Sequence, residues 1–114
     1  MGIAEKPLIT VLTPCYNSEK YIHRLLDSVL NQDYPRIQMI VMDDGSTDSS
    51  AEIIKSFIQK FNAKGYTLEY YFQSNQGQSV AINNGLKKVR GSYLLWPDSD
   101  DYYADKDTVG LLVD

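Results

Sequence analysis

The sequence predicts an α/β fold in which a mainly parallel sheet lies between layers of helices. Short apolar runs rich in β-branched residues alternate with segments whose apolar residues recur every three or four positions, which indicates strands that alternate with helices. Such units form parallel sheets joined by right-handed crossovers. Polar clusters follow three of the four predicted strands. Because parallel sheets bind ligands beyond the carboxyl ends of their strands, we expect these clusters to meet in one cleft.

The first predicted strand covers residues 8–13 and ends at Pro14. A helix follows it, and Asn17 or Ser18 is placed to cap its amino end. The apolar face of this helix consists of Ile22, Leu25, Leu26, Val29 and Leu30. Their spacing puts them on one side of the helix, so we expect that side to pack on the sheet.

The second predicted strand covers residues 37–42, and its apolar run ends at Asp43. Ser49 and Glu52 form a capping-box pattern at the start of the next helix. The clearest helical period in the chain is carried by Ile53, Ile54, Phe57, Ile58 and Phe61. This period predicts a second helix that packs on the sheet.

The second half of the chain continues the alternation. Residues 67–72 form the third predicted strand, and residues 79–89 form a helix that Gly91 ends. Residues 93–96 form a fourth strand that runs directly into a group of acids, and residues 108–113 begin another helix. The order therefore gives three strand–helix units, a fourth strand and a final helix.

Length and composition fit one globular domain over residues 1–114. Hydrophobic residues make up 43% and charged residues 23% of the chain, which is ordinary for a folded protein. The formal net charge of -4 disfavours nucleic acid as a partner. The single Cys15 fits a reducing compartment. No apolar stretch could span a bilayer and residues 1–6 lack a signal-peptide pattern, so we expect a cytoplasmic protein.

Two carboxylates follow the fourth predicted strand at a spacing of two residues. Asp98 and Asp100 point to the same side in extended backbone, and Asp101 comes next. Like charges held together repel one another, and Mg²⁺ or Mn²⁺ with hard oxygen ligands relieves that repulsion. The alternative is a solvated acidic turn that caps the following helix. The position directly after an apolar strand favours a metal site formed by Asp98 and Asp100.

Asp43 and Asp44 follow the second predicted strand, and Gly45 comes after them. They either form a tight turn with a helix cap or accept hydrogen bonds from a ligand, such as a base imide or a ribose hydroxyl. Both interpretations remain open at this point. Tyr16 follows the first strand and either offers a stacking face for a flat base or is a half-buried aromatic residue.

The remaining polar residues give weaker signals. The segment 75–77, together with Ala81, Asn83 and Gly85, indicates close helix packing combined with a polar lining that includes Asn75 and Gly77. No phosphate-binding loop motif occurs in the sequence, so a bound diphosphate would need a cation. Cys15 has no histidine near a strand end to activate it, and we expect it to be a small buried packing residue.

In this order, the motifs resemble those of family 2 glycosyltransferases, inverting enzymes of the GT-A fold that use nucleotide-diphosphate sugars. The matching segments are residues 9–17, 41–48, 75–85 and 91–101. The resemblance extends from about Pro7 to the last residue. It implies a Rossmann-like three-layer α/β/α fold. Ile82 departs from the pattern, because many members carry arginine there.

The resemblance also implies roles for single residues. Pro14 and Tyr16 would line the base pocket, and Asp44 with Asp43 would hydrogen-bond the uracil or ribose. Asp100 would be the leading ligand of Mg²⁺ or Mn²⁺, with Asp98 near both ribose and metal. The nucleotide-binding set implied in this way is Pro14, Tyr16, Asp43, Asp44, Asn75, Gly77, Asn83 and Asp98.

The activity implied by the resemblance is metal-assisted transfer of a sugar, with inversion, from a nucleotide-diphosphate donor. A UDP-sugar is the expected donor, and the acceptor is a hydroxyl of a saccharide or of a lipid-linked molecule. The enzyme would be a hexosyl- or N-acetylhexosaminyltransferase of cell-surface polysaccharide biosynthesis. In the full-length protein it would work in the cytoplasm or at the cytoplasmic face of a membrane.

The family resemblance further implies that the general base and the acceptor site lie in the second half of the domain, after Asp114. The sequence therefore predicts the donor-binding part of a GT-A domain, truncated after the Asp-x-Asp motif and inactive alone. Its exposed face could support a dimer. The alternative is a module that binds nucleotide diphosphates without catalysis.

Overall fold

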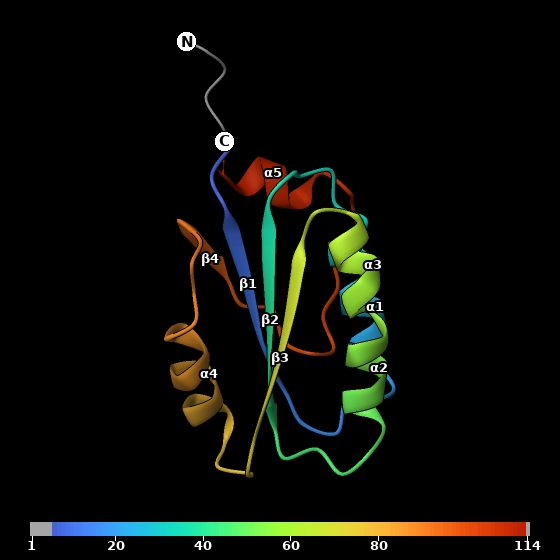
Figure 1. Cartoon of the computed structure of the whole chain (residues 1–114), viewed down its shortest axis with the longest axis vertical. Coiled ribbons are helices and arrows are strands. Elements are labelled where there is room, and N and C mark those ends of the chain that lie inside the picture. Colours follow the sequence, from blue (N-terminus) through green and yellow to red (C-terminus); the bar gives the residue numbers. More distant parts are fainter. Residues whose placement is uncertain (1–5, 114) are drawn as a thin grey trace.

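The computed structural model describes residues 6–113 and shows a four-stranded sheet with helices on both faces (Figure 1). Residues 1–5, which carry most of the segment tested for a signal peptide, and Asp114 lie outside the described residues. The elements in chain order are β1 (Ile9–Cys15), α1 (Ile22–Leu30), β2 (Ile37–Asp44), α2 (Ser50–Ser56), α3 (Ile58–Ala63), β3 (Thr67–Gln73), α4 (Gln78–Leu86), β4 (Tyr93–Leu95) and α5 (Thr108–Val113). This order confirms the predicted alternation.

The strands lie in the order β3-β2-β1-β4, and every neighbouring pair is parallel. The chain first builds outward from β1 through β2 to β3, then returns to place β4 on the other side of β1. The strand order therefore reverses at β1. In open parallel sheets a ligand crevice forms at that point, beyond the carboxyl ends of the strands.

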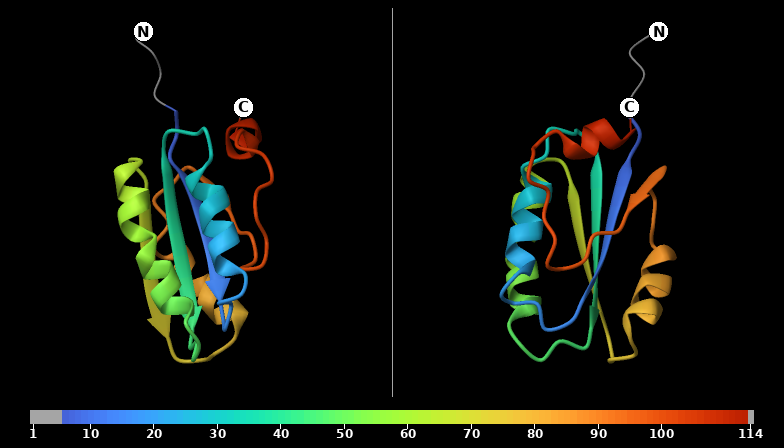
Figure 2. Two further views of the ribbon diagram at one scale, coloured as in Figure 1. Left: turned by 90° about the vertical axis from the view of Figure 1, so that its right-hand side faces the viewer. Right: turned by 180° about the vertical axis from the view of Figure 1, so that it is seen from behind.

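Three layers surround this reversal point. Helices α1, α2 and α3 cover one face of the sheet and α4 covers the other (Figures 1 and 2). The chain after β4 runs back along α1 to α5, which lies at the amino ends of the strands (Figure 2). The buried Gln32 fastens this return, since its Nε2 donates to the Asp105 carbonyl at 2.8 Å and its Oε1 accepts from the Val109 N–H at 2.9 Å.

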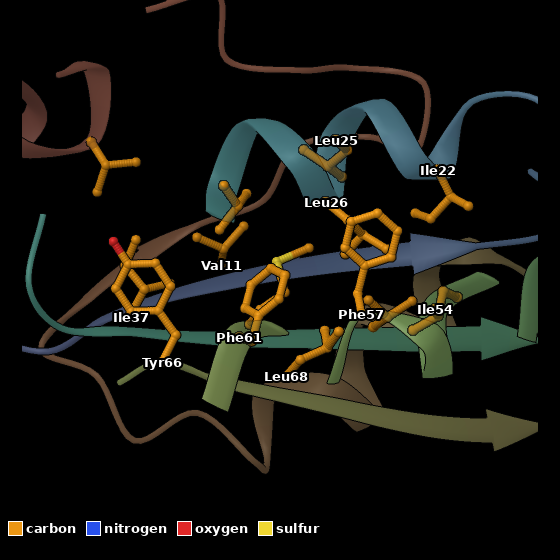
Figure 3. Close-up of a cluster of buried hydrophobic side chains, with 14 of the residues drawn as sticks. Val11, Ile22, Leu25, Leu26, Ile37, Ile54, Phe57, Phe61, Tyr66 and Leu68 are labelled. Atoms are coloured by element: carbon orange, nitrogen blue, oxygen red, sulfur yellow. The ribbon is translucent and has the colours of Figure 1, made fainter. Parts of the chain in front are cut away.

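The larger core cluster fills the space between the sheet and α1–α3. Apolar side chains of the two central strands meet the predicted apolar faces of the helices there (Figure 3). Labelled members are Val11, Ile22, Leu25, Leu26, Ile37, Ile54, Phe57, Phe61, Tyr66 and Leu68. Each side chain of this size that is removed from water contributes about 1.5–3 kcal/mol, so this layer dominates the stability of the fold.

A smaller core cluster lies under α4 and contains Leu12, Ile40, Met42 and Ala81. Gly85 lets α4 approach the sheet closely. A Cβ atom added at this position would lie 2.4 Å from Leu12 Cδ1 and 2.9 Å from Met42 Cγ. The close helix packing that the sequence suggested for this segment is therefore present.

Strands β1, β2 and β3 continue beyond their predicted ends, β3 by the single residue Gln73. Strand β1 continues through Pro14 to Cys15, and β2 continues through Asp44. Proline lacks a backbone N–H and is tolerated where a strand has a free side. Strand β4 pairs with β1 only over Ile9–Val11, so beyond Val11 this side of β1 has no strand partner within the described chain.

The predicted side-chain caps are absent, and only Ser49, the N-cap residue of α2, stands at its predicted position. The N-cap of α1 is Tyr21, and no side chain caps this helix or α2. In place of the Ser49–Glu52 capping box, Asp48 Oδ1 accepts a hydrogen bond from the Ser50 N–H at 2.9 Å. Loop contacts thus replace caps, because the side chains before both helices bond to neighbouring loops.

The second predicted helix is divided at Phe57 into α2 and α3. The Phe57 N–H donates to the Ile54 carbonyl and the Phe61 N–H donates to the Phe57 carbonyl, both at 3.0 Å. The break is therefore one tightened turn, and the apolar face stays on the sheet. Within residues 6–113, no helix combines the length and the apolar character needed to cross a membrane.

Candidate functional site

A pocket of about 500 Å³ lies at the carboxyl ends of the central strands. Four chain segments contribute to it: the end of β1 with the following loop, the end of β2, the loop before α4, and the segment after β4. The lining residues are Pro14, Cys15, Tyr16, Asn17, Ser18, Tyr21, Asp44, Asn75, Gly77, Gln78, Asp98, Ser99 and Asp100. The predicted meeting of the polar clusters in one cleft is confirmed.

Most of the residues selected from the sequence line this pocket, namely Pro14, Tyr16, Asp44, Asn75, Gly77, Asp98 and Asp100. Asp43 and Asn83 are not among the lining residues. Asp43 is fully buried, and Asn83 lies exposed on α4. The pocket therefore unites the base, nucleotide and metal candidates with two exceptions.

The carboxylate of Asp44 organises the loop before α4. Its Oδ1 accepts from Gln73 Nε2 at 2.9 Å and from the Gln76 N–H at 2.8 Å. Its Oδ2 accepts from the Gly77 N–H at 3.0 Å and from Asn75 Nδ2 at 3.4 Å. Burial raises the pKa of Asp44, but the hydrogen bonds from Gln76, Gln73 and Gly77 outweigh it and leave the pKa below its ordinary value.

Asp43 points to the opposite face of the sheet from Asp44, because successive strand residues alternate. Its Oδ1 accepts from the Ser46 N–H at 2.9 Å and its Oδ2 accepts from the Tyr70 hydroxyl at 2.6 Å. Burial and this hydrogen bond raise the pKa of Tyr70. Asp43 thus joins the turn after β2 to β3, beneath the helices.

The loop after β1 presents Tyr16 to solvent, with 52% of the residue exposed. The next residue, Asn17, has a φ of 46°, a left-handed conformation that asparagine adopts more readily than most residues. Asn17 Oδ1 accepts from the Thr47 N–H at 2.8 Å and from the Asp48 N–H at 3.3 Å. Its own N–H donates to Ser46 Oγ at 2.8 Å. The turn that presents Tyr16 is therefore fastened to the loop after β2.

Residues 98–101, which we call the acidic loop, contain three exposed carboxylates. One oxygen from each of Asp98, Asp100 and Asp101 lies within 4.8 Å of the others. The Asp98 N–H donates to Asp101 Oδ2 at 2.9 Å and the Asp101 N–H donates to the Asp98 carbonyl at 3.0 Å, so Asp101 closes the turn. Among the described residues, none hydrogen-bonds the Asp100 carboxylate.

This donor set fits a divalent cation with hard oxygen ligands. Asp98 and Asp100 line the pocket, whereas Asp101 lines a separate hollow beside Trp96. Gln78 Nε2 makes only a long hydrogen bond of 3.4 Å to Asp98 Oδ1. Asp98 and Asp100 are therefore the better placed pair to hold a cation in the pocket.

Several lining residues had no signal of their own in the sequence. Ser18, Tyr21, Gln78 and Ser99 are ordinary polar residues, and only their position beside the motifs could have indicated them. Cys15 is 1% exposed and belongs to the larger core cluster, which confirms the expected packing role. Burial raises the pKa of its thiol.

Comparison with known sequences shows which family this chain belongs to. The model of the family described as Glycosyl transferase family 2 matches residues 10–114. An uncharacterized glycosyltransferase of Haemophilus influenzae is 44% identical over 99 residues, which is 87% of this chain and 38% of that protein. The chain therefore spans well under half the length of this relative.

Two solved structures show a similar fold. Staphylococcus aureus TarS in complex with UDP-GlcNAc has a TM-score of 0.81 and 35% identity, covering 93% of this chain and 30% of that one. TarS is a poly(ribitol-phosphate) β-N-acetylglucosaminyltransferase. The mannosyltransferase PcManGT from Pyrobaculum calidifontis, in complex with GDP-Man and Mn²⁺, has a TM-score of 0.84 and 28% identity, covering 96% of this chain and 32% of that one.

Proposed function

Because the chain belongs to glycosyl transferase family 2, we propose that it binds a nucleotide-diphosphate sugar and positions it for transfer to an acceptor hydroxyl. The GT-A fold predicted from the sequence is confirmed by the likeness to solved glycosyltransferases. The observation that carries the proposal is the pocket that unites Tyr16, Asp44 and the acids Asp98 and Asp100. An aromatic face, a carboxylate and a cation site are what a base, a ribose and a diphosphate require.

The proposed base site lies between Pro14, Tyr16 and Asp44. The exposed ring of Tyr16 offers a face for stacking on a flat base. Support for a uracil base comes from TarS, whose structures contain UDP and UDP-GlcNAc. We therefore propose a UDP-sugar as donor, and an N-acetylhexosamine or hexose as the sugar.

The proposed nucleotide-binding residues also include Asn75 and Gly77. Both line the pocket, in the loop that hydrogen-bonds to the Asp44 carboxylate. Asp43 and Asn83 are left outside this set. Asp43 already bonds Ser46 and Tyr70, and Asn83 lies away from the pocket lining. Their contribution to binding would be indirect.

Asp98 and Asp100 are proposed to hold Mg²⁺ or Mn²⁺, and Mn²⁺ accompanies the donor in PcManGT. When bound, such a cation offsets the negative charge that builds up on the departing nucleoside diphosphate. The unbonded Asp100 carboxylate is the leading ligand in this proposal. Asp101 keeps the acidic loop closed through the Asp98 N–H.

The transfer itself is proposed to invert the anomeric carbon. The acceptor hydroxyl attacks from the side opposite the diphosphate, and a general base takes its proton. In this proposal Tyr16 and Asp44 hold the base and the ribose, and Asp98 and Asp100 would hold the cation that binds the diphosphate. We assign no general base among residues 6–113. A saccharide or a lipid-linked glycan of a cell-surface polymer is the proposed acceptor.

Titration calorimetry with UDP and GDP, each with and without Mn²⁺, tests this proposal. We expect UDP to bind and Mn²⁺ to raise its affinity by about tenfold, because charge-assisted contacts are added. Failure of both nucleotides to bind under any of these conditions would refute the proposal. If GDP binds more tightly than UDP, the proposed donor is a guanine nucleotide and not a uracil nucleotide.

A second assay separates an enzyme from a binding module. The chain is incubated with UDP-GlcNAc and Mn²⁺, and the release of UDP is followed over time. Slow release supports group transfer to water or to an added acceptor. Binding without any release supports the alternative of a nucleotide-diphosphate-binding module.

A further inference from the structure

We propose that Ser18 is a positioning residue for the acidic loop, and that its hydroxyl holds Ser99 so that Asp98 and Asp100 face the pocket together. The proposal rests on the proposed function for the identity of the ligand. Its geometry stands independently, because Ser18 belongs to the loop after β1 and Ser99 lies between the two acids.

The contact between the two serines is short and sheltered. Ser18 is 5% exposed, and its Oγ lies 2.7 Å from Ser99 Oγ. Ser18 Oγ also donates to the Tyr16 carbonyl at 3.2 Å. A hydroxyl has one proton to donate, so Ser99 is the donor in the bond between the serines. This arrangement gives each hydroxyl proton one acceptor.

Ser18 is itself held firmly from the core side. Its N–H donates to Ser50 Oγ at 2.8 Å, and Ser50 is fully buried at the first turn of α2. Its carbonyl accepts from the N–H groups of Tyr21 and Ile22, both at 2.9 Å. The backbone N–H and the carbonyl of Ser18 are therefore both hydrogen-bonded, which fixes the residue whose hydroxyl contacts the acidic loop.

The acidic loop has few other attachments. Asp98 and Asp101 bond to each other, which closes the turn but does not place it relative to the sheet. The bond from Gln78 to Asp98 is long, at 3.4 Å. Within the described chain, the Ser18–Ser99 bond is thus the one short hydrogen bond that joins residues 98–101 to another element.

Such an attachment bears on cation binding because a cation needs its ligands in place. Ligands that are already ordered lose less conformational freedom when they bind. Without the bond between the serines, the acidic loop would be held only by the long bond from Gln78 and through its chain neighbours, such as the Tyr103 N–H that donates to Ser28 Oγ at 2.9 Å. The cation would then have to complete the ordering of Asp98 and Asp100. Removing the bond should therefore weaken the cation-dependent part of nucleotide binding and spare the base site.

Calorimetry of UDP binding with and without Mn²⁺ tests this separation. Ser18→Ala and Ser99→Ala should each lower the affinity for UDP in Mn²⁺ by about fivefold, since one neutral hydrogen bond is lost. The double variant should lose no more than either single one. Ser99→Ala leaves the core untouched, because Ser99 is only partly buried and lies in a loop. In all three variants, affinity for UDP without Mn²⁺ should fall by a clearly smaller factor than affinity for UDP with Mn²⁺, because the base site loses at most the bond from Ser18 to the Tyr16 carbonyl.

Ser46→Ala is the matched control. Ser46 Oγ accepts a hydrogen bond from the N–H of Asn17, the residue before Ser18 in the same loop, and makes no hydrogen bond to the acidic loop. If Ser18→Ala lowers the affinity for UDP by the same factor with and without Mn²⁺, the role of Ser18 is a general structural one and the proposal is overturned. Unchanged affinity in Mn²⁺ for both serine variants would overturn it as well.

A measurement without any ligand keeps this inference distinct from the proposed function. Amide hydrogen exchange in the metal-free chain should be faster at Asp101, whose N–H closes the acidic loop, in Ser18→Ala than in the parent. Ser46→Ala should leave that exchange unchanged. If the parent fails to bind UDP but this difference appears, the ligand is wrong and the positioning role stands. Equal exchange in parent and Ser18→Ala would refute the positioning role.

Discussion

Asp44 shows how one side chain can line a pocket and also hold its rim. Asp44 is 4% exposed, and its carboxylate accepts from four donors, one at the end of β3 and three in the loop before α4. Asp43 is its direct neighbour but faces the other side of the sheet, toward Tyr70. Two acids that are adjacent in the sequence therefore have separate roles.

Asp44→Asn should lower the free energy of unfolding by about 2 kcal/mol, because an amide NH₂ group would face the donors that the carboxylate now accepts. Urea unfolding of parent and variant measures this difference. Asp27→Asn, at an exposed carboxylate on α1, is the matched control. A loss no larger than that of the control would contradict the anchoring role of Asp44.

The same comparison has a pH dependence. The pKa of Asp44 lies below its ordinary value of 3.8 in the folded chain, so its charge stabilises the fold above that value. This stabilisation is lost as the pH falls through the lower folded pKa. The difference between parent and Asp44→Asn should therefore be constant near neutral pH and shrink below about pH 4. A difference that widens in acid would contradict this assignment.

Asp100→Ala should abolish most of the Mn²⁺-dependent gain in UDP affinity and leave the melting temperature unchanged. The Asp100 carboxylate is exposed and bonds to no described residue, so its loss costs the fold little. Calorimetry and thermal unfolding provide the two readouts. Asp27→Ala should change neither. A variant at Asp100 that responds to Mn²⁺ like the parent would move the metal site elsewhere.

At the scale of helices and strands, the type and order of the elements could be predicted because hydrophobic periods determine them. Strand ends were less predictable. The apolar run of β2 stops at Met42, whereas hydrogen-bonded pairing with β3 carries the strand on to Asp44. This extension puts Asp43 and Asp44 on opposite faces, which a turn after Met42 would not.

The side-chain bonds at the helix starts were mispredicted, although Ser49 is the N-cap residue of α2 as its pattern indicated. The side chain of Asn17 bonds to the loop after β2 in place of its own helix, and Asp48 does the work expected of Ser49. Cap patterns describe local bonds, but here loops far apart in sequence supply the partners. The pocket residues Ser18 and Ser99 escaped prediction in the same way, since their contact joins distant segments.

Gly85→Ala tests the close approach of α4 to the sheet. The added Cβ would meet Leu12 and Met42 inside the smaller core cluster, and overpacking of this kind costs about 2 kcal/mol. We expect a lower melting temperature despite the better helix propensity of alanine. Ser79→Ala, at an exposed position of the same helix, should leave it unchanged or raise it slightly. A stabilised Gly85→Ala variant would contradict the packing.

At the scale of the whole molecule, several large apolar side chains are exposed, among them residues after β4 and on α5. Trp96 is 65% exposed, and Leu111 and Leu112 are 64% and 58% exposed. Trp96 borders a hollow of about 450 Å³ that Leu94, Leu95, Pro97, Asp101, Tyr102 and Tyr103 also line. Exposed apolar surface favours association between molecules. We therefore keep the dimer expected from the sequence as a prediction.

Sedimentation velocity over a range of concentrations tests this association. The parent should show a growing share of dimer with concentration, and Trp96→Ser should reduce that share by removing apolar contact area. Tyr16→Ser is the control, because Tyr16 is an exposed aromatic residue that lines the pocket. This variant should show the same share of dimer as the parent. A parent that stays monomeric at the highest attainable concentration would refute the prediction.

The central position of β1 has a consequence for the order of folding events. This strand is synthesised before the other described strands, yet its partner on one side, Tyr93–Leu95, is the last described strand to be made. The pairing of β1 with β4, which covers only Ile9–Val11, must therefore wait for a very long loop to close, and such non-local closure is slow. Pulse-labelled hydrogen exchange during refolding should show β1 and β2 protected before β4. Simultaneous protection of all strands would point instead to a single concerted step that recruits both ends of the polypeptide at once.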